Sequence, residues 1–209
     1  MEQYQTLRAA AQAEFVEKRS RFIGYAMPVK TSEEALAFIA RISKQHWDAT
    51  HNVYAYIIRN EGVKRYSDDG EPQGTAGIPT LDVLEKQGLT DCCVVVTRYF
   101  GGVLLGAGGL FRAYSKAAKD ALDNAGVSVV RRWVEAEFSC SYGAAERLKN
   151  ELGAFDALVT DTRYAADVTL RLLVPEEKAE ALSARISDAS AGTVALRSVG
   201  ESLRPVRIR

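Results

Sequence analysis

The residues with the clearest potential for chemistry lie in a glycine-rich segment that follows a strongly apolar stretch. Its glycines are Gly101, Gly102, Gly106, Gly108 and Gly109. Glycine allows positive φ angles and lets a ligand or another backbone come close. A helix that begins just beyond would leave unpaired N–H groups, which suit an anion such as phosphate. Arg98 and Arg112 flank the segment, so the pattern indicates either a tight structural turn or an anion contact.

Neither common phosphate-binding motif is present in this segment. A P-loop needs a lysine directly after its last glycine, but Gly106 is followed by Ala107. The dinucleotide pattern G-x-G-x-x-G fails because Phe111 stands at its last position. A binder or enzyme of a phosphorylated small molecule stays open as an alternative, without the lysine that phosphate loops use.

A short acidic loop, with Asp68, Asp69 and Glu71, is the second candidate site. Carboxylate oxygens could ligate a hard cation such as Mg²⁺, but Asp-Gly and Glu-Pro pairs also form ordinary turns. We favour ion pairing with the basic segment and predict carboxylate–guanidinium contacts to Arg98 and Arg112. No metal and no cofactor are predicted.

Nucleophilic catalysis has little support in this sequence. Ser67, His51 and Asp69 could form a triad only if the fold brought them into contact. A lone histidine before a strand is more often a hydrogen-bonded structural residue, and His46 and His51 lack H-E-x-x-H spacing. We therefore predict no catalytic residues.

Basic and aromatic residues are interleaved at positions 15–22 and around the glycine-rich segment, a pattern typical of sequence-tolerant single-strand binding. The alternative is that the aromatic side chains are core and the bases solvated. The predicted binding residues combine these positions with the two loops: Lys18, Arg19, Arg21, His51, Ser67, Asp68, Asp69, Glu71, Thr75, Arg98, Tyr99, Gly101, Gly102, Gly106, Gly108, Gly109, Arg112 and Tyr114.

The elements that must position these residues follow from hydrophobic periodicity and from turn signals. Thr31 and Glu34 form a capping box that opens a helix. Its predicted core stripe consists of Leu36, Ile39 and Ile42, joined by Ala35 and Phe38. Gly106, Gly108 and Gly109 precede a helix without a Ser, Thr, Asp or Asn cap. For the first part of the chain we predict strands at 20–29, 52–59 and 92–97, a polar loop at 60–77, and helices at 31–47, 79–87 and 110–124.

The remainder of the chain has the order β-α-β-β-α-β, which is typical of a ferredoxin-like fold. Pro175 is placed at the first position of its second helix. The predicted elements are strands at 133–141, 157–163, 166–174 and 193–203, and helices at 142–152 and 176–189. The sequence thus predicts an α+β protein with two domains, residues 1–130 and 131–209.

Composition narrows the class of protein. The 209 residues include 27 Lys and Arg against 27 Asp and Glu, so a whole-surface attraction to polyanions is excluded. No apolar run approaches the ~20 residues that cross a bilayer, and the N-terminus lacks a signal-peptide pattern. Cys92 and Cys93 are adjacent and should point to opposite faces of a strand. With Cys140 they predict free thiols and a cytoplasmic location.

A long, ordered series of short motifs runs through the first part of the chain. These motifs are Lys18-Arg19-Ser20-Arg21-Phe22, His51-Asn52, Ser67-Asp68-Asp69-Gly70-Glu71-Pro72, Gly74-Thr75-Ala76-Gly77, Pro79, Arg98-Tyr99-Phe100-Gly101-Gly102, Leu105-Gly106, Gly108-Gly109-Leu110 and Arg112-Ala113-Tyr114. At these motifs the chain resembles the IMPACT family, in its bacterial, YigZ-like branch. The similarity covers the N-terminal two-thirds, and the C-terminal part resembles the bacterial extension without a sharp motif.

This resemblance implies both a fold and a role. The N-terminal domain would resemble a ribosomal-protein fold, of the type of domain 2 of small-subunit protein five. The C-terminal domain would resemble domains of elongation factor G. Eukaryotic relatives regulate translation initiation, so the expected function is a non-enzymatic, translation-associated regulator that binds RNA, the ribosome or a translation factor. A purely protein-binding regulator is the further alternative.

Overall fold

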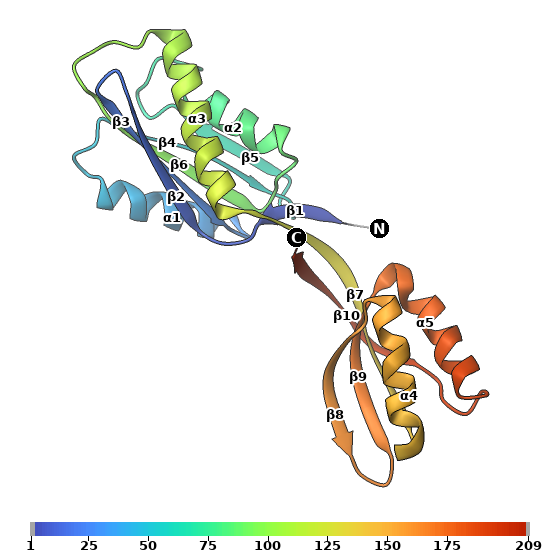
Figure 1. Ribbon diagram of the computed structural model, residues 1–209. Helices are drawn as coiled ribbons and strands as arrows, with labels where there is room; N and C mark the ends of the chain where they lie inside the picture. The colour runs from blue at the N-terminus through green and yellow to red at the C-terminus, as the bar shows by residue number, and fades with distance from the viewer. Residues whose placement is uncertain (1–2, 208–209) are drawn as a thin grey trace. The chain divides into compact units, whose positions relative to one another are not determined.

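A computed structural model describes residues 3–207, which divide into two compact units, Tyr4–Val129 and Val130–Val206. Both units combine an antiparallel sheet with helices, which confirms the α+β class (Figure 1). The elements of the first unit, in chain order, are β1 (Tyr4–Leu7), β2 (Ala11–Glu17), β3 (Ser20–Pro28), α1 (Ser32–Gln45), β4 (His51–Ile58), β5 (Val63–Ser67), α2 (Gly77–Lys86), β6 (Cys92–Tyr99) and α3 (Ala107–Ala125).

The sheet of the first unit has the order β2-β3-β6-β4-β5, with every neighbouring pair antiparallel. Helices α2 and α3 cover one face and α1 covers the other (Figure 1). The central strand β6 is buried on both faces. Cys92 and Val94 pack into the core under α2 and α3, whereas Cys93 and Val95 pack under α1. The predicted opposite orientation of the adjacent cysteines is therefore confirmed.

Helix α1 shows how capping and periodicity fix one of these layers. Thr31 Oγ1 accepts a hydrogen bond from the backbone N–H of Glu34 at 3.2 Å, as the capping box predicts. The Glu34 carboxylate instead accepts from the N–H of Lys30, one residue earlier than in a reciprocal box. The predicted stripe is wrong at Leu36, which is 51% exposed. The buried face runs through Ala35, Phe38 and Ile42, at the spacing of one side of a helix.

Three strands of the first unit fall outside the predicted elements. Strands β1 and β2 occupy an N-terminal region for which no element was predicted, and β5 lies inside the predicted loop 60–77. Helix α3 begins at Ala107 rather than Leu110, so Gly108 and Gly109 belong to its first turn. The glycine-rich turn itself is therefore shorter than predicted.

The second unit has the element order β-α-β-β-α-β. Strand β9 lies between β7 and β8, and β10 pairs with β7. The bounds predicted for its two helices are confirmed, whereas Pro175 is the N-cap of α5 rather than its first helical residue. The elements are β7 (Val127–Cys140), which begins in the first unit, α4 (Tyr142–Leu152), η1 (Gly153–Phe155), β8 (Leu158–Tyr164), β9 (Val168–Pro175), α5 (Glu176–Ala189) and β10 (Arg197–Arg207).

Helices α4 and α5 supply the second hydrophobic core together with the sheet of this unit. Leu148 from α4 and Leu182 from α5 are fully buried with Phe138 and Leu170. Over the described part of the chain, no helix is both long and apolar enough to cross a membrane.

Candidate functional site

The acidic loop folds around the side chain of Asp68. Its carboxylate accepts hydrogen bonds from the backbone N–H groups of Gly74, Ala76 and Gly77, at 2.9, 3.1 and 2.7 Å. Gly77 is the first residue of α2, whose own N-cap residue makes no side-chain hydrogen bond. Asp68 therefore satisfies donors that the start of a helix leaves unpaired. Its role is to close the loop, which leaves it little capacity for a metal ion or a partner.

The triad considered for Ser67, His51 and Asp69 does not assemble. Ser67 Oγ accepts a hydrogen bond from the N–H of Asp69 at 3.1 Å, and the Asp69 carboxylate accepts one from the N–H of Asn52 at 2.5 Å. His51 Nδ1 lies 2.7 Å from the backbone oxygen of Asp69. Because a carbonyl oxygen only accepts, this nitrogen carries a proton, and these residues form a hydrogen-bonded turn.

Glu71 is the centre of a buried polar network. One carboxylate oxygen accepts hydrogen bonds from Arg98 Nη1 at 2.6 Å and from the Tyr114 hydroxyl at 2.7 Å. His51 Nε2 lies 3.8 Å from the other oxygen. Burial and the nearby Glu71 carboxylate raise the pKa of Tyr114, so its hydroxyl stays a donor. The predicted contact between the acidic loop and Arg98 is confirmed, whereas Arg112 makes no such contact.

Arg98 connects this network to the glycine-rich turn. Its Nη2 lies 3.4 Å from Ser20 Oγ, which also accepts a hydrogen bond from the N–H of Gly101. The guanidinium carbon also lies 5.5 and 5.4 Å from the ring centroids of Phe22 and Phe100. The side chains of Arg98 and Glu71 are only 6% and 3% exposed. Both residues were predicted to contact a partner, but burial gives them a positioning role.

Gly101 sets the distance between this turn and the hairpin that joins β2 to β3. A Cβ atom at Gly101 would lie 2.0 Å from the backbone carbonyl carbon of Arg19. Lys18 and Arg19 form the tip of the hairpin, with φ angles of 44° and 64°. The close approach that only glycine permits therefore places two cationic residues against the glycine-rich turn.

The start of α3 completes this region. Its N-cap is Gly106, with φ of 73° and no side-chain hydrogen bond, which confirms the predicted lack of a side-chain cap. The guanidinium group of Arg112 lies near the first turn, because a Cβ atom added at Gly108 would be 3.8 Å from its Nη1. We refer to the hairpin tip 18–19, the segment 100–106 and the first turns of α3 (107–116) as the turn surface.

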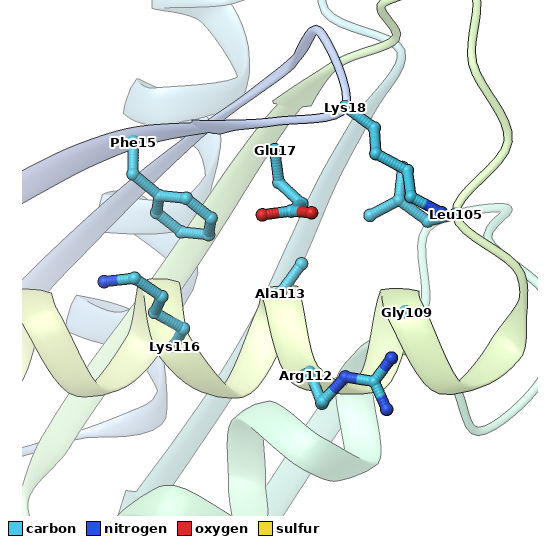
Figure 2. A pocket seen from close by; sticks show the side chains of 8 residues that line it. All are labelled: Phe15, Glu17, Lys18, Leu105, Gly109, Arg112, Ala113 and Lys116. Atoms are coloured by element: carbon cyan, nitrogen blue, oxygen red, sulfur yellow. The ribbon is translucent and has the colours of Figure 1, made fainter.

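The turn surface contains a hollow of about 260 Å³ between the hairpin and α3 (Figure 2). Phe15, Glu17 and Lys18 project into it from the hairpin, and Arg112 and Lys116 line it from the helix. Lys116 pairs with Asp120 and lies over the ring of Phe15. Within residues 3–207, Lys18, Arg19 and Arg112 have no ion-pair partner. Among the described residues, these three cations are therefore not neutralised by an ion pair.

Apolar side chains are also exposed on the turn surface. Leu104 is 82% exposed, and Phe100, Val103 and Phe111 are also exposed. These residues were not among the predicted contacts. The sequence does contain a feature that could have identified them, namely an apolar run interrupted by glycines at positions 101, 102 and 106. Glycines weaken a strand, so these apolar residues are not expected to continue the preceding buried strand.

The other predicted residues lie away from the hollow or have partners. Arg21 pairs with Glu14 at 2.7 Å, and the Thr75 hydroxyl donates to the carbonyl of Pro72 at 2.6 Å. Tyr99 donates to Asp48 and contacts His46 Nδ1 at 2.9 Å.

His46 was assigned to a helix, but it caps the end of α1 and joins two tyrosines. Its Nε2 lies 2.6 Å from the Tyr25 hydroxyl, and its Nδ1 contacts Tyr99. Burial and the positive charge of Arg21 lower the pKa of His46. This favours the neutral ring, which can donate at one nitrogen and accept at the other. The arrangement stabilises the fold rather than forming a catalytic base.

The cysteines are buried free thiols. Burial raises the pKa of Cys92 to about 12 and raises that of Cys93 as well. Thiolate chemistry is therefore disfavoured at these positions. In the described part of the chain, no three His, Cys, Asp or Glu side chains are grouped to hold a metal ion.

Comparisons with known proteins agree with this two-unit organisation. The family model described as the Impact N-terminal domain matches residues 18–122, and a domain of unknown function, DUF1949, matches residues 138–193. The IMPACT family member YvyE of Bacillus subtilis is 42% identical over 190 residues, which cover 90% of this chain and 88% of YvyE. The IMPACT family member YigZ of Escherichia coli is 34% identical over 187 residues, 88% of this chain and 92% of YigZ.

A solved structure is also similar over almost its full length. It is described as the crystal structure of a hypothetical protein and shares 32% sequence identity with this chain, with a TM-score of 0.61. The match covers 96% of this chain and 98% of that one. The likeness therefore extends across both units.

Proposed function

Since this chain belongs to the IMPACT family, we propose that it is a non-enzymatic, translation-associated regulator whose turn surface binds RNA, free or within the ribosome. The observation that carries the proposal is the group of cations without ion-pair partners at this surface. Lys18 and Arg112 line one hollow, and Gly101 holds Arg19 beside it. Cations of this kind can neutralise phosphates, which supply most of the affinity in nucleic-acid binding.

Exposed aromatic side chains support the same proposal. Phe100 lies in the segment 100–106 and Phe111 in the first turns of α3, and both side chains are exposed. Unpaired bases stack on such rings with little dependence on sequence. Single-stranded RNA is therefore the form of partner that this surface fits best.

Charges on the sheet of the second unit contrast with those of the turn surface. Arg171 pairs with Glu137 at 3.4 Å, Arg204 with Glu135 at 3.1 Å, and Arg163 with Asp161 at 3.1 Å. Cations that already have carboxylate partners attract phosphate less, because the pair is nearly neutral. We therefore assign the RNA contact to the first unit.

The proposal includes the resemblance of the two units to domains of translation proteins. The β-α-β-β-α-β order of the second unit supports a ferredoxin-like fold of the kind found in elongation factor G. A ribosomal-protein-like first unit would place the protein among cytoplasmic translation components.

Removing the free cations tests the proposed RNA contact. Replacing Lys18, Arg19 and Arg112 together by alanine should weaken binding to a single-stranded RNA oligonucleotide and flatten its salt dependence. Each neutralised phosphate contributes about −0.7 to the slope of the logarithm of the binding constant against the logarithm of salt concentration. Losing three such contacts should therefore make this slope less negative by about 2. Arg112→Ala alone should cost about 1–3 kcal/mol of binding free energy, the range for a hydrogen bond to a charged group. Fluorescence anisotropy across a series of salt concentrations measures both quantities.

The matched control removes equally exposed cations elsewhere. Lys30, Lys86 and Arg147 are exposed and have no ion-pair partner within residues 3–207, so their triple alanine variant has the same net charge. This control should retain the affinity and the slope of the unaltered protein. Equal losses in both triple variants would indicate general charge attraction and would contradict a defined site.

The exposed apolar residues favour one second candidate, a protein-binding regulator. Leu104 and Phe111 could anchor an apolar segment of a partner. Such binding would depend little on salt, because apolar burial carries no counterion release. A flat salt dependence with loss of binding in Leu104→Ser would favour this candidate over RNA.

A further inference from the structure

A single carboxylate lies among the cations that line the hollow of the turn surface. Glu17 projects from the end of β2 toward Ala113, between Lys18 and the pair formed by Phe15 and Lys116 (Figure 2). It is exposed and has no hydrogen-bond or ion-pair partner among residues 3–207. A site for phosphate alone would gain nothing from this negative charge, so the carboxylate points to a ligand that also has hydroxyl or amino donors.

We infer that the hollow holds one ribonucleotide of an RNA chain and that Glu17 accepts a hydrogen bond from its ribose 2′-hydroxyl. The inference rests on the proposed function and adds to it a discrimination between RNA and DNA. A carboxylate is an acceptor-only group, and the 2′-hydroxyl is the donor that distinguishes RNA from DNA. Glu17 therefore favours the ribose of RNA over the deoxyribose of DNA.

The order of groups along the hollow matches the order of groups in a nucleotide. Arg112 and Lys18 lie toward the glycine-rich turn, where an adjacent phosphate would be neutralised (Figure 2). Glu17 lies in the middle, at the place of the sugar. Phe15 lies at the other end, where a base would meet the Lys116 side chain that lies over its ring; the ring itself stacks on Phe22 at 5.3 Å.

The size of the hollow favours a segment of a polymer over a free metabolite. Its volume of about 260 Å³ lies below the ~300–1,000 Å³ of ordinary small-molecule sites. One nucleotide held there would owe most of its affinity to neighbouring phosphates on the exposed cations of the turn surface. The same carboxylate would repel an acidic peptide, which disfavours that occupant.

Three oligonucleotides of one sequence test the inference: RNA, DNA and 2′-O-methyl RNA. Binding to the unaltered protein is measured by fluorescence anisotropy at a single salt concentration. We expect RNA to bind about tenfold more tightly than the other two, because a hydrogen bond to a charged group contributes about that factor or more. Since 2′-O-methyl RNA retains the oxygen but lacks the donor, it should bind like DNA.

Glu17→Ala should remove this preference. We expect it to lower RNA affinity about tenfold while DNA affinity stays the same or rises slightly, because a negative charge is lost. Glu17→Gln keeps an amide oxygen as acceptor and should retain part of the preference. The control is Glu180→Ala in α5, which removes an exposed carboxylate that has no hydrogen-bond or ion-pair partner among residues 3–207. It should leave all three affinities unchanged. Thermal melting of each variant by circular dichroism checks that the fold is retained.

The failures of the two proposals can be told apart. If the unaltered protein binds all three oligonucleotides equally, or if Glu17→Ala keeps the preference for RNA, the assignment of Glu17 is wrong and the RNA contact stands. If none of the oligonucleotides binds, the proposed function and this inference both fail.

Discussion

Replacing Glu71 by glutamine is expected to lower the free energy of unfolding of the first unit by about 3–5 kcal/mol, the range for breaking a buried ion pair. Glutamine keeps the size of the side chain but removes the charge that compensates Arg98, 2.6 Å away and almost fully buried. It also weakens the acceptor of the Tyr114 hydroxyl. Urea unfolding followed by circular dichroism measures the loss.

Glu85→Gln provides the matched control. Glu85 accepts a hydrogen bond from Lys64 at the same distance, 2.6 Å, but the side chains of Lys64 and Glu85 are 57% and 38% exposed. An exposed pair contributes at most about 1 kcal/mol, because water already solvates both charges. The two substitutions have the same chemistry, so their difference measures the effect of burial.

A second substitution identifies the source of the loss. Adding Arg98→Met to Glu71→Gln should recover part of the stability, since it removes the buried charge left without a partner. If Glu71→Gln costs no more than Glu85→Gln, Arg98 is reached by water in solution. In that case the network does not hold the glycine-rich turn in place.

The parts of the fold that were predicted correctly have strong periodic signals. The helices of the second unit end where their apolar positions end, and the strand around Val94 is an unbroken apolar run. Strand β5 was missed because its residues Val63–Ser67 are mostly exposed at the edge of the sheet and form no apolar pattern. Glycines at positions 108 and 109 suggested a turn, but an N-terminal helical turn tolerates them when its other side packs on the core.

Residue type identifies candidate site residues but does not separate the buried ones from the exposed ones. Complementary charge was sufficient to predict the contact of the acidic loop with Arg98. Helical periodicity does carry a signal for the burial of Tyr114, because this residue lies on the apolar side of α3 with Leu110, Ala117 and Ala121. Arg112 falls outside that stripe and is exposed. The same periodicity would have separated a structural tyrosine from a surface arginine.

Glu17 could not have been selected from the sequence alone. Its place beside Lys18 suggests an ordinary solvated pair, and its role depends on the hairpin lying against α3. That packing joins residues almost a hundred positions apart and follows from sheet order rather than from a local motif. Long-range placement of this kind leaves no periodic trace in a single sequence.

Gly101→Ala should reduce stability and RNA binding together. The added methyl group would meet the backbone of Arg19 at 2.0 Å, so the hairpin tip or the glycine-rich turn must move. Overpacking of this kind costs about 1–3 kcal/mol of stability. Because the displaced tip contains Lys18 and Arg19, RNA affinity should fall even though no cation is removed. Urea unfolding and anisotropy at one salt concentration measure the two effects.

Gly102→Ala separates displacement of the hairpin from strain in the turn. Gly102 has a φ angle of 79°, and an added Cβ would have no neighbour within 4 Å. Alanine there should cost about 1–2 kcal/mol through its left-handed backbone while the hairpin tip stays in place. RNA affinity should therefore fall for Gly101→Ala and not for Gly102→Ala. If both variants lose stability but bind RNA as well as the unaltered protein, the position of the hairpin tip does not matter for binding, and the turn surface is structural.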